Sequence, residues 1–283
     1  MIKVSSNERI TRFDLARTLA GRGRNWTTAY LVDHMMVDTG CFFTTPELIQ
    51  QLAKQPVSKI LNTHTHEDHI GADGVLQRQF PELEILAHPL ALPILADPVH
   101  KQPLHPYRRI YWGWPDPSLA RAVVDGEIIH TDHYNFQVIY TPGHSPDHLS
   151  LYEPQQGWLF TGDLYVGGQD RALRDGSNIW EIIASLKKVV LLPLTKLFPG
   201  CARIRDNPVE ELTIKINYLE ALGEQVLNLH SKGYSVSQIV HTLCGRPMTI
   251  EFVTLGNFSR RHLVLSYLDI PEDRLNGNDA NPT

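Results

Sequence analysis

The sequence predicts an α/β layered domain followed by an all-helical extension, and three observations support this prediction. Strand-like and helix-like patterns alternate from residue 10 to residue 87, as they do in layered α/β folds. Several apolar runs end at side chains that bind metal ions. From Asn207 onward the chain has the start and stop residues of helices and no strand pattern. We therefore expect the layered domain over residues 1–205 and the helical extension over residues 206–283.

The first part of the layered domain is predicted from hydrophobic periodicity and turn residues. We predict strands over residues 10–15, 29–32, 35–37, 59–62 and 84–87. A helix begins with Thr45 as its N-cap and Pro46 in its first turn, and it ends before Pro56. A second helix covers residues 72–80, and we expect its first turn to carry His69.

Residues 88–125 fit neither the helix period nor the strand period. The segment is rich in proline and carries aromatic residues around Arg108 and Arg109. A long segment of this kind inside a compact domain is usually functional or disordered. We interpret it as a lid-like insertion, and two interpretations of its side chains are open. In one, the aromatic residues contact the substrate and the arginines bind an anionic group. The alternative, which we slightly favour, is a packed surface loop with a small aromatic core of its own. The candidate substrate-binding residues are Tyr107, Tyr111 and Trp114.

One short stretch combines the side chains that bind transition metals. Directly after the apolar pair Ile60-Leu61, the chain places His64, His66, Asp68 and His69 within six positions. Imidazole and carboxylate groups are ligands for zinc, iron and manganese, and a loop at a strand end holds them with little loss of entropy. A merely polar, histidine-rich turn would explain this stretch alone, but it would not explain the residues that follow.

Three later strand ends supply further candidate ligands. His144 follows a Pro-Gly turn after the strand pattern of residues 136–140, and Asp163 follows Phe160 and a Thr-Gly turn. Cys201 stands at the end of a third run of this kind, residues 197–200. Each turn alone is ordinary. Four strand ends that each carry a metal-binding side chain predict a single metal centre.

This order of residues resembles the metallo-β-lactamase superfamily, whose pattern is His-x-His-x-Asp-His, a lone histidine, a bridging aspartate and a final histidine. The matching residues are His64, His66, Asp68, His69, His144 and Asp163, with Asp38 as a supporting acid. The resemblance covers about residues 10–205 and implies an αββα sandwich with metal ions at one edge, between the two sheets. The motifs at residues 141–148 and 160–163 look most like those of the glyoxalase II-like branch, and the chain also resembles lactamase-like proteins with a helical C-terminal tail.

The resemblance also implies two neighbouring metal sites. The first set of ligands would be His64, His66 and His144, and the second Asp68, His69 and Asp163, with Asp163 bridging. The chain departs from the family pattern at Cys201, where these relatives usually have a histidine. Cys201 is therefore either a thiolate ligand of the second ion or a small cysteine behind a site with one ion. We expect zinc, with two ions if Cys201 binds and one if it does not, and with iron or manganese as alternatives.

The ligands predict a metal-dependent hydrolase that uses a metal-bound hydroxide. Two cations about 3.5 to 4 Å apart can share a water and lower its pKa towards neutrality, so no serine or cysteine nucleophile is needed. Asp68 would orient the hydroxide and pass its proton to the leaving group. We expect a small-molecule thioester, ester or lactone as substrate. The alternatives are a phosphodiesterase or ribonuclease acting on RNA, and a mononuclear iron dioxygenase of the persulfide type.

Composition limits the expected location and partners. A net charge of −5 provides no overall basic surface for nucleic acid, although a local patch can exist within an acidic total. Cys41, Cys201 and Cys244 are odd in number and widely spaced, which argues against a disulfide framework. The first eight residues contain no apolar signal region, and the longest aliphatic run, residues 189–194, is too short to span a bilayer. We expect a cytoplasmic protein without membrane contact, and a homo-oligomer is one option for its assembly.

The extension contains signals for three helices. We predict them over residues 207–233, over residues 235–245 behind a capping box, and from Asn257 or Ser259 onward. The second and third resemble a small winged-helix or helix-turn-helix unit whose basic face would include Arg260 and Arg261. We favour the simpler interpretation that the extension packs on the layered domain or on a second subunit. We predict that residues 276–283 are mobile.

Overall fold

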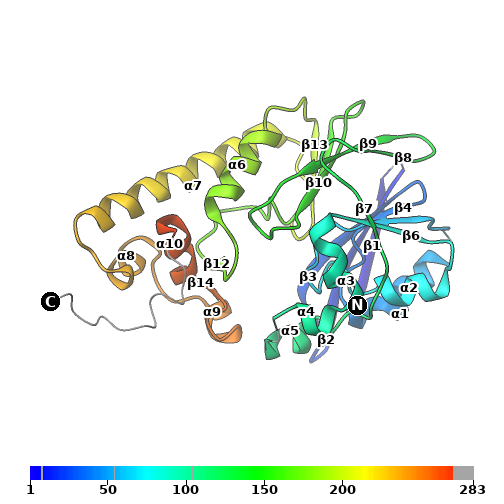
Figure 1. Ribbon diagram of the computed structural model, residues 1–283, viewed down its shortest axis with the longest axis horizontal. Coiled ribbons are helices and arrows are strands. Elements are labelled where there is room, and N and C mark those ends of the chain that lie inside the picture. Colours follow the sequence, from blue (N-terminus) through cyan, green and yellow to red (C-terminus); the bar gives the residue numbers. More distant parts are fainter. Residues whose placement is uncertain (8, 54, 104, 270–283) are drawn as a thin grey trace.

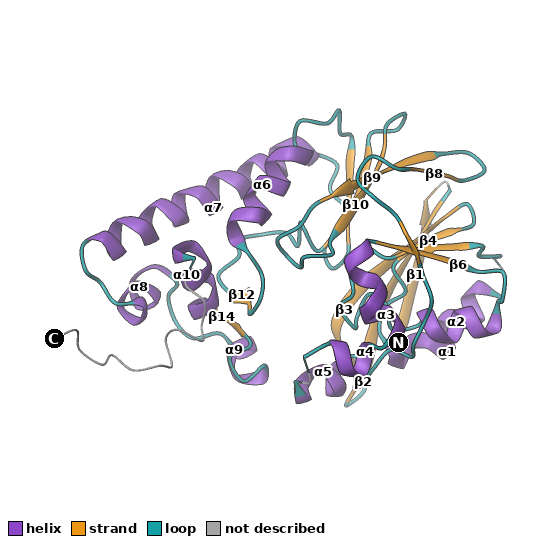
Figure 2. Cartoon of the chain, in the orientation of Figure 1, coloured by secondary structure: helices purple, strands orange, loops and turns teal. Residues whose placement is uncertain are grey.

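The computed structural model describes residues 1–269 except 8, 54 and 104. Two β-sheets lie face to face and helices cover their outer faces (Figures 1 and 2). The first sheet has the order β1 (Ile2–Asn7), β2 (Ile10–Leu19), β3 (Arg22–Val32), β4 (Met35–Val37), β5 (Lys59–Leu61), β6 (Glu84–Ala87) and β7 (Arg121–Ala122). The second has the order β13 (Lys196–Pro199), β11 (Trp158–Gly162), β10 (Leu149–Glu153), β9 (Asn135–Tyr140) and β8 (Ile128–His130).

Side-chain alternation along the strands builds the layers. On β3, Tyr30 and Val32 face the cluster between the two sheets, whereas Ala29 and Leu31 face the cluster beneath the outer helices. On β11, Phe160 joins the cluster between the sheets. Successive residues of a strand point to opposite faces, so a strand buried on both sides is apolar without interruption. This arrangement confirms the predicted αββα sandwich.

Different helices cover the two sheets. Buried leucines of α1 (Thr45–Leu52) and α2 (Asp73–Gln79) pack on the first sheet. The second sheet is covered by α6 (Ile179–Val189), whose N-cap Asn178 accepts hydrogen bonds from two backbone N–H groups. Two predicted helix starts are shifted: the N-cap of α1 is Thr44, and α2 begins at Asp73, so His69 precedes the helix instead of lying in its first turn. None of the helices in the described part of the chain combines the length and the apolar character needed to cross a membrane.

The extension shares a core with the layered domain. It comprises α7 (Pro208–Ser231), α8 (Val236–Leu243), α9 (Thr249–Val253) and α10 (Arg260–Leu268), to one side of the sheets in Figure 1. Leu212 and Leu219 of α7 and Val264 of α10 belong to the same buried cluster as Leu159 of β11 and Leu186 of α6. The extension therefore packs on the layered domain, as we favoured. The predicted capping box at Ser235 is present, and Ser259 caps α10.

The extension also contains a short strand that the sequence pattern did not predict. β14 (Phe258–Ser259) pairs antiparallel with β12 (Leu173–Arg174), which precedes α6. The expectation of no strand beyond Asn207 was therefore wrong in this detail. Two residues are too few to produce a recognisable alternation, and their pairing depends on a partner far away in the sequence. The end predicted to be mobile, residues 276–283, lies outside the described residues.

The insertion over residues 88–125 is more regular than expected. It contains the 3₁₀ turn η2 (Pro89–Ala91), three short helices and β7. The helices are α3 (Leu92–Ala96), α4 (Pro98–Lys101) and α5 (Pro106–Tyr111), and each has a proline in its first two positions. Proline is favoured there because the missing N–H would have no partner in the helix. Helices of four to six residues are too short to show a helical period, so the prolines looked like breaks in the pattern.

Candidate metal centre

The predicted ligands meet at one edge of the sandwich because of strand direction. β9, β11 and β13 run in the same direction, since β10 is antiparallel to both β9 and β11 and β13 is parallel to β11. Their carboxyl ends therefore lie at a common edge, where His144, Asp163 and Cys201 follow. The loop after β5 of the facing sheet brings His64, His66, Asp68 and His69 to the same place.

Three histidines form the first group of candidate ligands. The Nε2 atoms of His64 and His144 each lie 2.9 Å from Nδ1 of His66. Nδ1 of His64 lies 3.0 Å from the hydroxyl of Thr63, which leaves Nε2 to face the other two rings. The three nitrogen atoms lie close enough together to bind one metal ion.

A second group lies beside the first and contains Asp163. Oδ1 of Asp163 is 3.5 Å from Nε2 of His69, and Oδ2 is 3.6 Å from Nε2 of His144. Ligand atoms of His64, His69 and Asp163 are also close enough to hold a metal ion. Nε2 of His69 and Oδ1 of Asp163 are buried and have no hydrogen-bond partner within the described residues. Buried polar atoms are normally paired, so these two atoms fit the ligands of an ion.

Asp38 supports the metal loop, as the sequence predicted. Its Oδ1 accepts hydrogen bonds from the backbone N–H and the hydroxyl of Thr63, and its Oδ2 lies 2.7 Å from Nδ1 of His69. This contact turns Nε2 of His69 towards the centre. A carboxylate behind a histidine orients the ring and increases its basicity as a ligand.

Two supporting residues in the motif Thr141–His148 were not identified from the sequence. The carboxylate of Asp147 accepts hydrogen bonds from the backbone N–H and the hydroxyl of Thr65. His148 Nε2 accepts the backbone N–H of Asp163, so it sets the position of that residue. Both lie close in sequence to His144, and this proximity was the available signal. Their partners, Thr65 and Asp163, could not be inferred because they lie in the loops after two other strands, β5 and β11.

Gly162 brings Asp163 close to the metal loop. Its φ is +47°, and a Cβ at this position would lie 2.7 Å from Cβ of Thr63 and 2.8 Å from Nε2 of His148. A larger residue would therefore displace one of these neighbours. Glycine is required here both by the backbone conformation and by the close approach of the two strand ends.

The electrostatics of the group suit metal ligands. Burial lowers the pKa of His64, His66 and His144, which keeps these rings neutral. Burial opposes the charge on His69, but Asp163, Asp38 and Asp68 together raise its pKa well above the usual value. His69 in turn keeps the pKa of Asp163 low despite burial. The proton on His69 balances the negative charge of the nearby carboxylates, and a metal cation can balance the same charge.

Asp68 and Cys201 lie at the side of the second group. Oδ2 of Asp68 accepts a hydrogen bond from the hydroxyl of Thr27 and is 3.9 Å from Nε2 of His69. Cys201 is exposed as a residue, and its thiol is near the carboxylate of Asp163. Withdrawal of the thiol from water and the nearby carboxylate of Asp163 raise the pKa of Cys201 well above its usual value. Cys201 is not a member of either group of candidate ligands found within the described residues, and its role as a ligand stays a prediction.

A pocket of about 290 Å³ opens next to the first histidine group. Its lining includes His66 and His144, Lys101 and Arg108 of the insertion, and Arg174 of β12. Tyr107, Tyr111 and Trp114 are not among its lining residues. Their predicted contact with a substrate therefore stays a prediction.

The three aromatic residues predicted to bind substrate have other surroundings. The hydroxyl of Tyr107 donates to Oδ1 of Asn257 in the extension at 2.5 Å. The ring of Tyr107 also contacts Trp112 edge to face, as the alternative of a small aromatic core implied. Trp114 lines a different hollow together with Phe42, and Tyr111 is half-buried at the end of α5.

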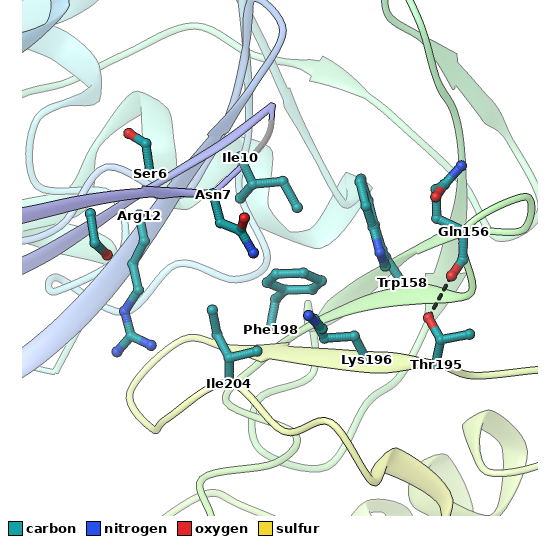
Figure 3. A pocket seen from close by; sticks show the side chains of 11 residues that line it. Ser6, Asn7, Ile10, Arg12, Gln156, Trp158, Thr195, Lys196, Phe198 and Ile204 are labelled. Carbon is teal, nitrogen blue, oxygen red and sulfur yellow. Dashed lines mark hydrogen bonds between the residues drawn. The ribbon is translucent and has the colours of Figure 1, made fainter.

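Figure 3 shows another cavity, of about 320 Å³. Asn7 and Ile10 of the first hairpin face Trp158 and Lys196, which open β11 and β13. The predicted ligands follow the carboxyl ends of the same two strands. The cavity is therefore at the opposite end of the strands, and no predicted site residue lines it.

Curated relatives match parts of the chain. An atrochrysone carboxyl ACP thioesterase from Aspergillus fumigatus is 29% identical over 171 residues, 60% of this chain and 46% of the relative. A hydroxyacylglutathione hydrolase from Legionella pneumophila is 35% identical over 141 residues, 49% of this chain and 46% of the relative. The chain thus spans about half the length of these relatives. A beta-lactamase-like protein 2 homolog from Drosophila melanogaster is 25% identical over 75% of this chain and 69% of its own length.

Solved structures share the fold. A beta-lactamase domain protein from Burkholderia ambifaria has a TM-score of 0.70 at 16% identity, over 94% of this chain and 89% of that protein. A metallo-beta-lactamase family protein from Thermus thermophilus has a TM-score of 0.68 at 18% identity, over 97% and 96% of the two chains. The protein TTHA1623, solved in a di-iron-bound form, has a TM-score of 0.54 at 28% identity, over 69% and 96%.

The family model described as the metallo-beta-lactamase superfamily matches residues 23–201, which is more than half of the chain and includes every predicted ligand. The fold, the two groups of histidine and carboxylate ligands and this match agree. The chain belongs to the metallo-beta-lactamase superfamily.

Proposed function

We propose that this protein is a hydrolase of thioesters that works with two divalent metal ions. The observation that carries the proposal is the position of Asp163, whose two oxygen atoms face His69 and His144 at 3.5 and 3.6 Å. This position supports Asp163 as a residue that would help to hold both ions. A thioesterase and a hydroxyacylglutathione hydrolase are among the relatives, which supports thioester hydrolysis over the ester and lactone options.

The ligand types favour zinc, and the two sites would use different residues. His64, His66 and His144 would hold the first ion; His69, Asp68 and Asp163 would hold the second, with Cys201 as a further ligand. The di-iron form of TTHA1623 supports two ions and makes iron the main alternative. When bound, such ions lower the pKa of a shared water and polarise the carbonyl of the substrate.

The chain's own residues position the reaction and move the proton. The hydroxyl of Thr27 donates to Oδ2 of Asp68, so this carboxylate has a defined orientation beside His69. We assign Asp68 the task of accepting the proton of the attacking water and returning it to the leaving sulfur. A thiol has a pKa of about 8.5, so it leaves near neutral pH with little help from an acid. A site with one carboxylate in this position is therefore sufficient for a thioester.

Two cationic side chains of the pocket support a negatively charged substrate. Lys101 and Arg174 line the pocket next to His66 and His144, and no ion pair of either is found within the described residues. Arg108 lines the same pocket but is paired with Glu67 at 2.9 Å. Lys101 and Arg174 are therefore the cations available to a carboxylate or phosphate on the thiol part of the substrate.

The proposal is tested with two thioesters of the same acyl group, one of glutathione and one of neutral N-acetylcysteamine, on zinc-loaded protein. We expect hydrolysis of both, with kcat/KM at least roughly tenfold higher for the anionic thioester, which is the effect of about 1.4 kcal/mol of charge complementarity. Lys101→Met/Arg174→Met should remove this preference and leave the neutral substrate unaffected. Arg109→Met, outside the pocket, is the matched control. Failure to hydrolyse either thioester would contradict the proposed function.

The two other functions predicted from the sequence have less support. Arg260, part of the predicted basic face, forms a salt bridge with Glu251 at 2.6 Å, so it does not present a free charge to RNA. A dioxygenase with a single iron ion would need only one group of ligands. The two oxygen atoms of Asp163 instead face histidines of both groups. Cleavage of single-stranded RNA, or oxygen uptake with glutathione persulfide, would be the result that favours one of these functions instead.

A further inference from the structure

The insertion contacts the metal loop at the residues before and after His66. Nε2 of Gln102 donates to the backbone carbonyl of Thr65, the residue before His66. Nη1 of Arg108 lies 2.9 Å from Oε1 of Glu67, the residue after it. All four partners are buried, and the side chains of Arg108 and Glu67 are 2% and 0% exposed.

We propose that Gln102 and Arg108 are positioning residues that hold His66 in place to bind the first metal ion. His66 offers Nδ1 to the centre, as its 2.9 Å distances to His64 and His144 show. Because Nδ1 is only two bonds from Cβ, closer to the main chain than Nε2, its position depends closely on the backbone of residues 65–67. The contacts of Gln102 with Thr65 and of Arg108 with Glu67 restrict this backbone. Rotation of the His66 side chain could compensate little for a shift of the main chain, so the restriction keeps Nδ1 in position.

The energetics of the buried pair indicate positioning instead of stability. Burying a carboxylate and a guanidinium costs a large desolvation energy, and their attraction often only offsets it. Nε of Arg108 has no hydrogen-bond partner within the described residues, so the pair is not fully compensated. Neither oxygen of Glu67 has a hydrogen-bond partner within the described residues, and burial raises the pKa of Glu67 to about 7, so the contact is a close, buried ion pair that contributes little stability. What the pair supplies is a short contact between the insertion and the metal loop.

The extension contacts α5, the helix that carries Arg108. Tyr107, the neighbour of Arg108 on α5, donates its hydroxyl to Asn257 at 2.5 Å. Asn257 also accepts, through its backbone carbonyl, the N–H of Asp175 next to β12. A line of contacts therefore runs from the extension through α5 to Glu67. This explains why Tyr107 points to the extension and not to the pocket.

The experiment separates positioning from folding. In Arg108→Met, Glu67 is left buried without its partner, and we expect Tm to fall. The double variant Glu67→Gln/Arg108→Met removes both charges at similar volume, so Tm should return towards the wild-type value. Gln102→Met removes the other anchor. The exposed pair Glu84 and Arg121, 2.7 Å apart, offers the control Glu84→Gln/Arg121→Met.

The readout is zinc release to a chromogenic chelator from zinc-loaded protein. We expect zinc to leave the double variant and Gln102→Met at least roughly tenfold faster than the wild type, the usual effect of losing a residue that orients a ligand. The control pair should release zinc at the wild-type rate. Release at the wild-type rate from a double variant with restored Tm would overturn the proposal.

This inference rests on the proposed function only for the metal ions, and the two fail in different ways. If zinc release changes as expected but no thioester is hydrolysed, the anchor stands and the proposed reaction is wrong. If thioesters are hydrolysed and zinc release from the double variant is unchanged, the reaction stands and the anchor is wrong.

Discussion

The metal loop, residues 63–69, and the insertion, residues 88–125, differ in how their roles are encoded. Both connect strands of the first sheet, and both contain charged and ring-bearing side chains. In the loop, four candidate ligands lie within six positions and the strand before them sets their direction. In the insertion, the important side chains act on partners in other parts of the chain. The role of a residue can therefore be inferred from the sequence when its partners are close in sequence. The same inference is misleading when the partners are far away in the chain.

Arg108 and Tyr107 show this difference. In sequence they form part of an aromatic and basic cluster, which suggests contact with a substrate. In the structure, Arg108 is in a buried pair with Glu67 and Tyr107 bonds to Asn257. Arg108 lines the pocket but is paired with Glu67, so its predicted role in binding an anionic group stays a prediction.

Asp68→Ala should have the largest effect, because it removes the only residue of the metal loop to which we assign proton transfer. We expect at least one metal ion to be retained and kcat for thioester hydrolysis to fall by roughly 10²- to 10⁴-fold. Metal content by plasma mass spectrometry and steady-state kinetics check both parts. Asp132→Ala, at an exposed acid, is the control. Unchanged turnover in Asp68→Ala would remove Asp68 from the mechanism.

Cys201→Ser should reduce the metal content from two ions towards one. A thiolate is a strong zinc ligand and a serine hydroxyl is a weak one, so the second site would lose affinity while His64, His66 and His144 keep theirs. Metal per chain, measured on protein purified without chelator, checks this. Cys244→Ser in the extension is the matched control. Equal metal content in wild type and Cys201→Ser would show that Cys201 is not a ligand.

Asp73→Asn tests the buried layer beneath the metal loop through pH. Asp73 accepts hydrogen bonds from Thr39 and Asn62, and burial raises its pKa to about 7. An acid whose pKa is raised in the folded protein is ionised only in the unfolded chain between about pH 4 and 7. Wild-type stability should therefore fall as pH rises through this window, by about 1.4 kcal/mol for each unit of pKa difference, and then level off.

In Asp73→Asn this part of the pH dependence should disappear, because an amide does not ionise. Its oxygen can still accept from Asn62 and its NH₂ can donate to Thr39. Urea unfolding of metal-free wild type and variant at pH 4 to 8 gives the difference, in which contributions of the histidines cancel. A parallel pH dependence of the two proteins would mean that the carboxyl group of Asp73 is already ionised in the folded state.

Trp114→Ala should have the smallest effect and bears on the insertion. Trp114 lines a hollow with Phe42, apart from the pocket that contains His66 and His144. We expect KM for the anionic thioester to change less than roughly threefold, as for other surface substitutions away from a site. Lys101→Met, inside the pocket, provides the comparison. A tenfold rise of KM in Trp114→Ala would instead establish the substrate contact predicted from the sequence.

The layered fold was predictable because its cause is local. The alternation that places Tyr30 between the sheets and Leu31 under the helices is visible in the sequence. The short helices of the insertion were not, since four to six residues show no period and their prolines read as breaks. The strand β14 was missed because two residues acquire strand geometry only by pairing with β12.

The kinds of ligand, their order along the chain and the strand ends that carry them can be inferred from residue chemistry and short-range periodicity. Three other features appear only in the folded molecule: the two oxygens of Asp163 face different histidines, Gln102 and Arg108 contact the neighbours of His66, and the extension shares a core with α6. Each of these joins residues far apart in the chain, as Tyr107 and Asn257 are, 150 positions from each other. Such contacts depend on how whole elements pack, and no local pattern records them.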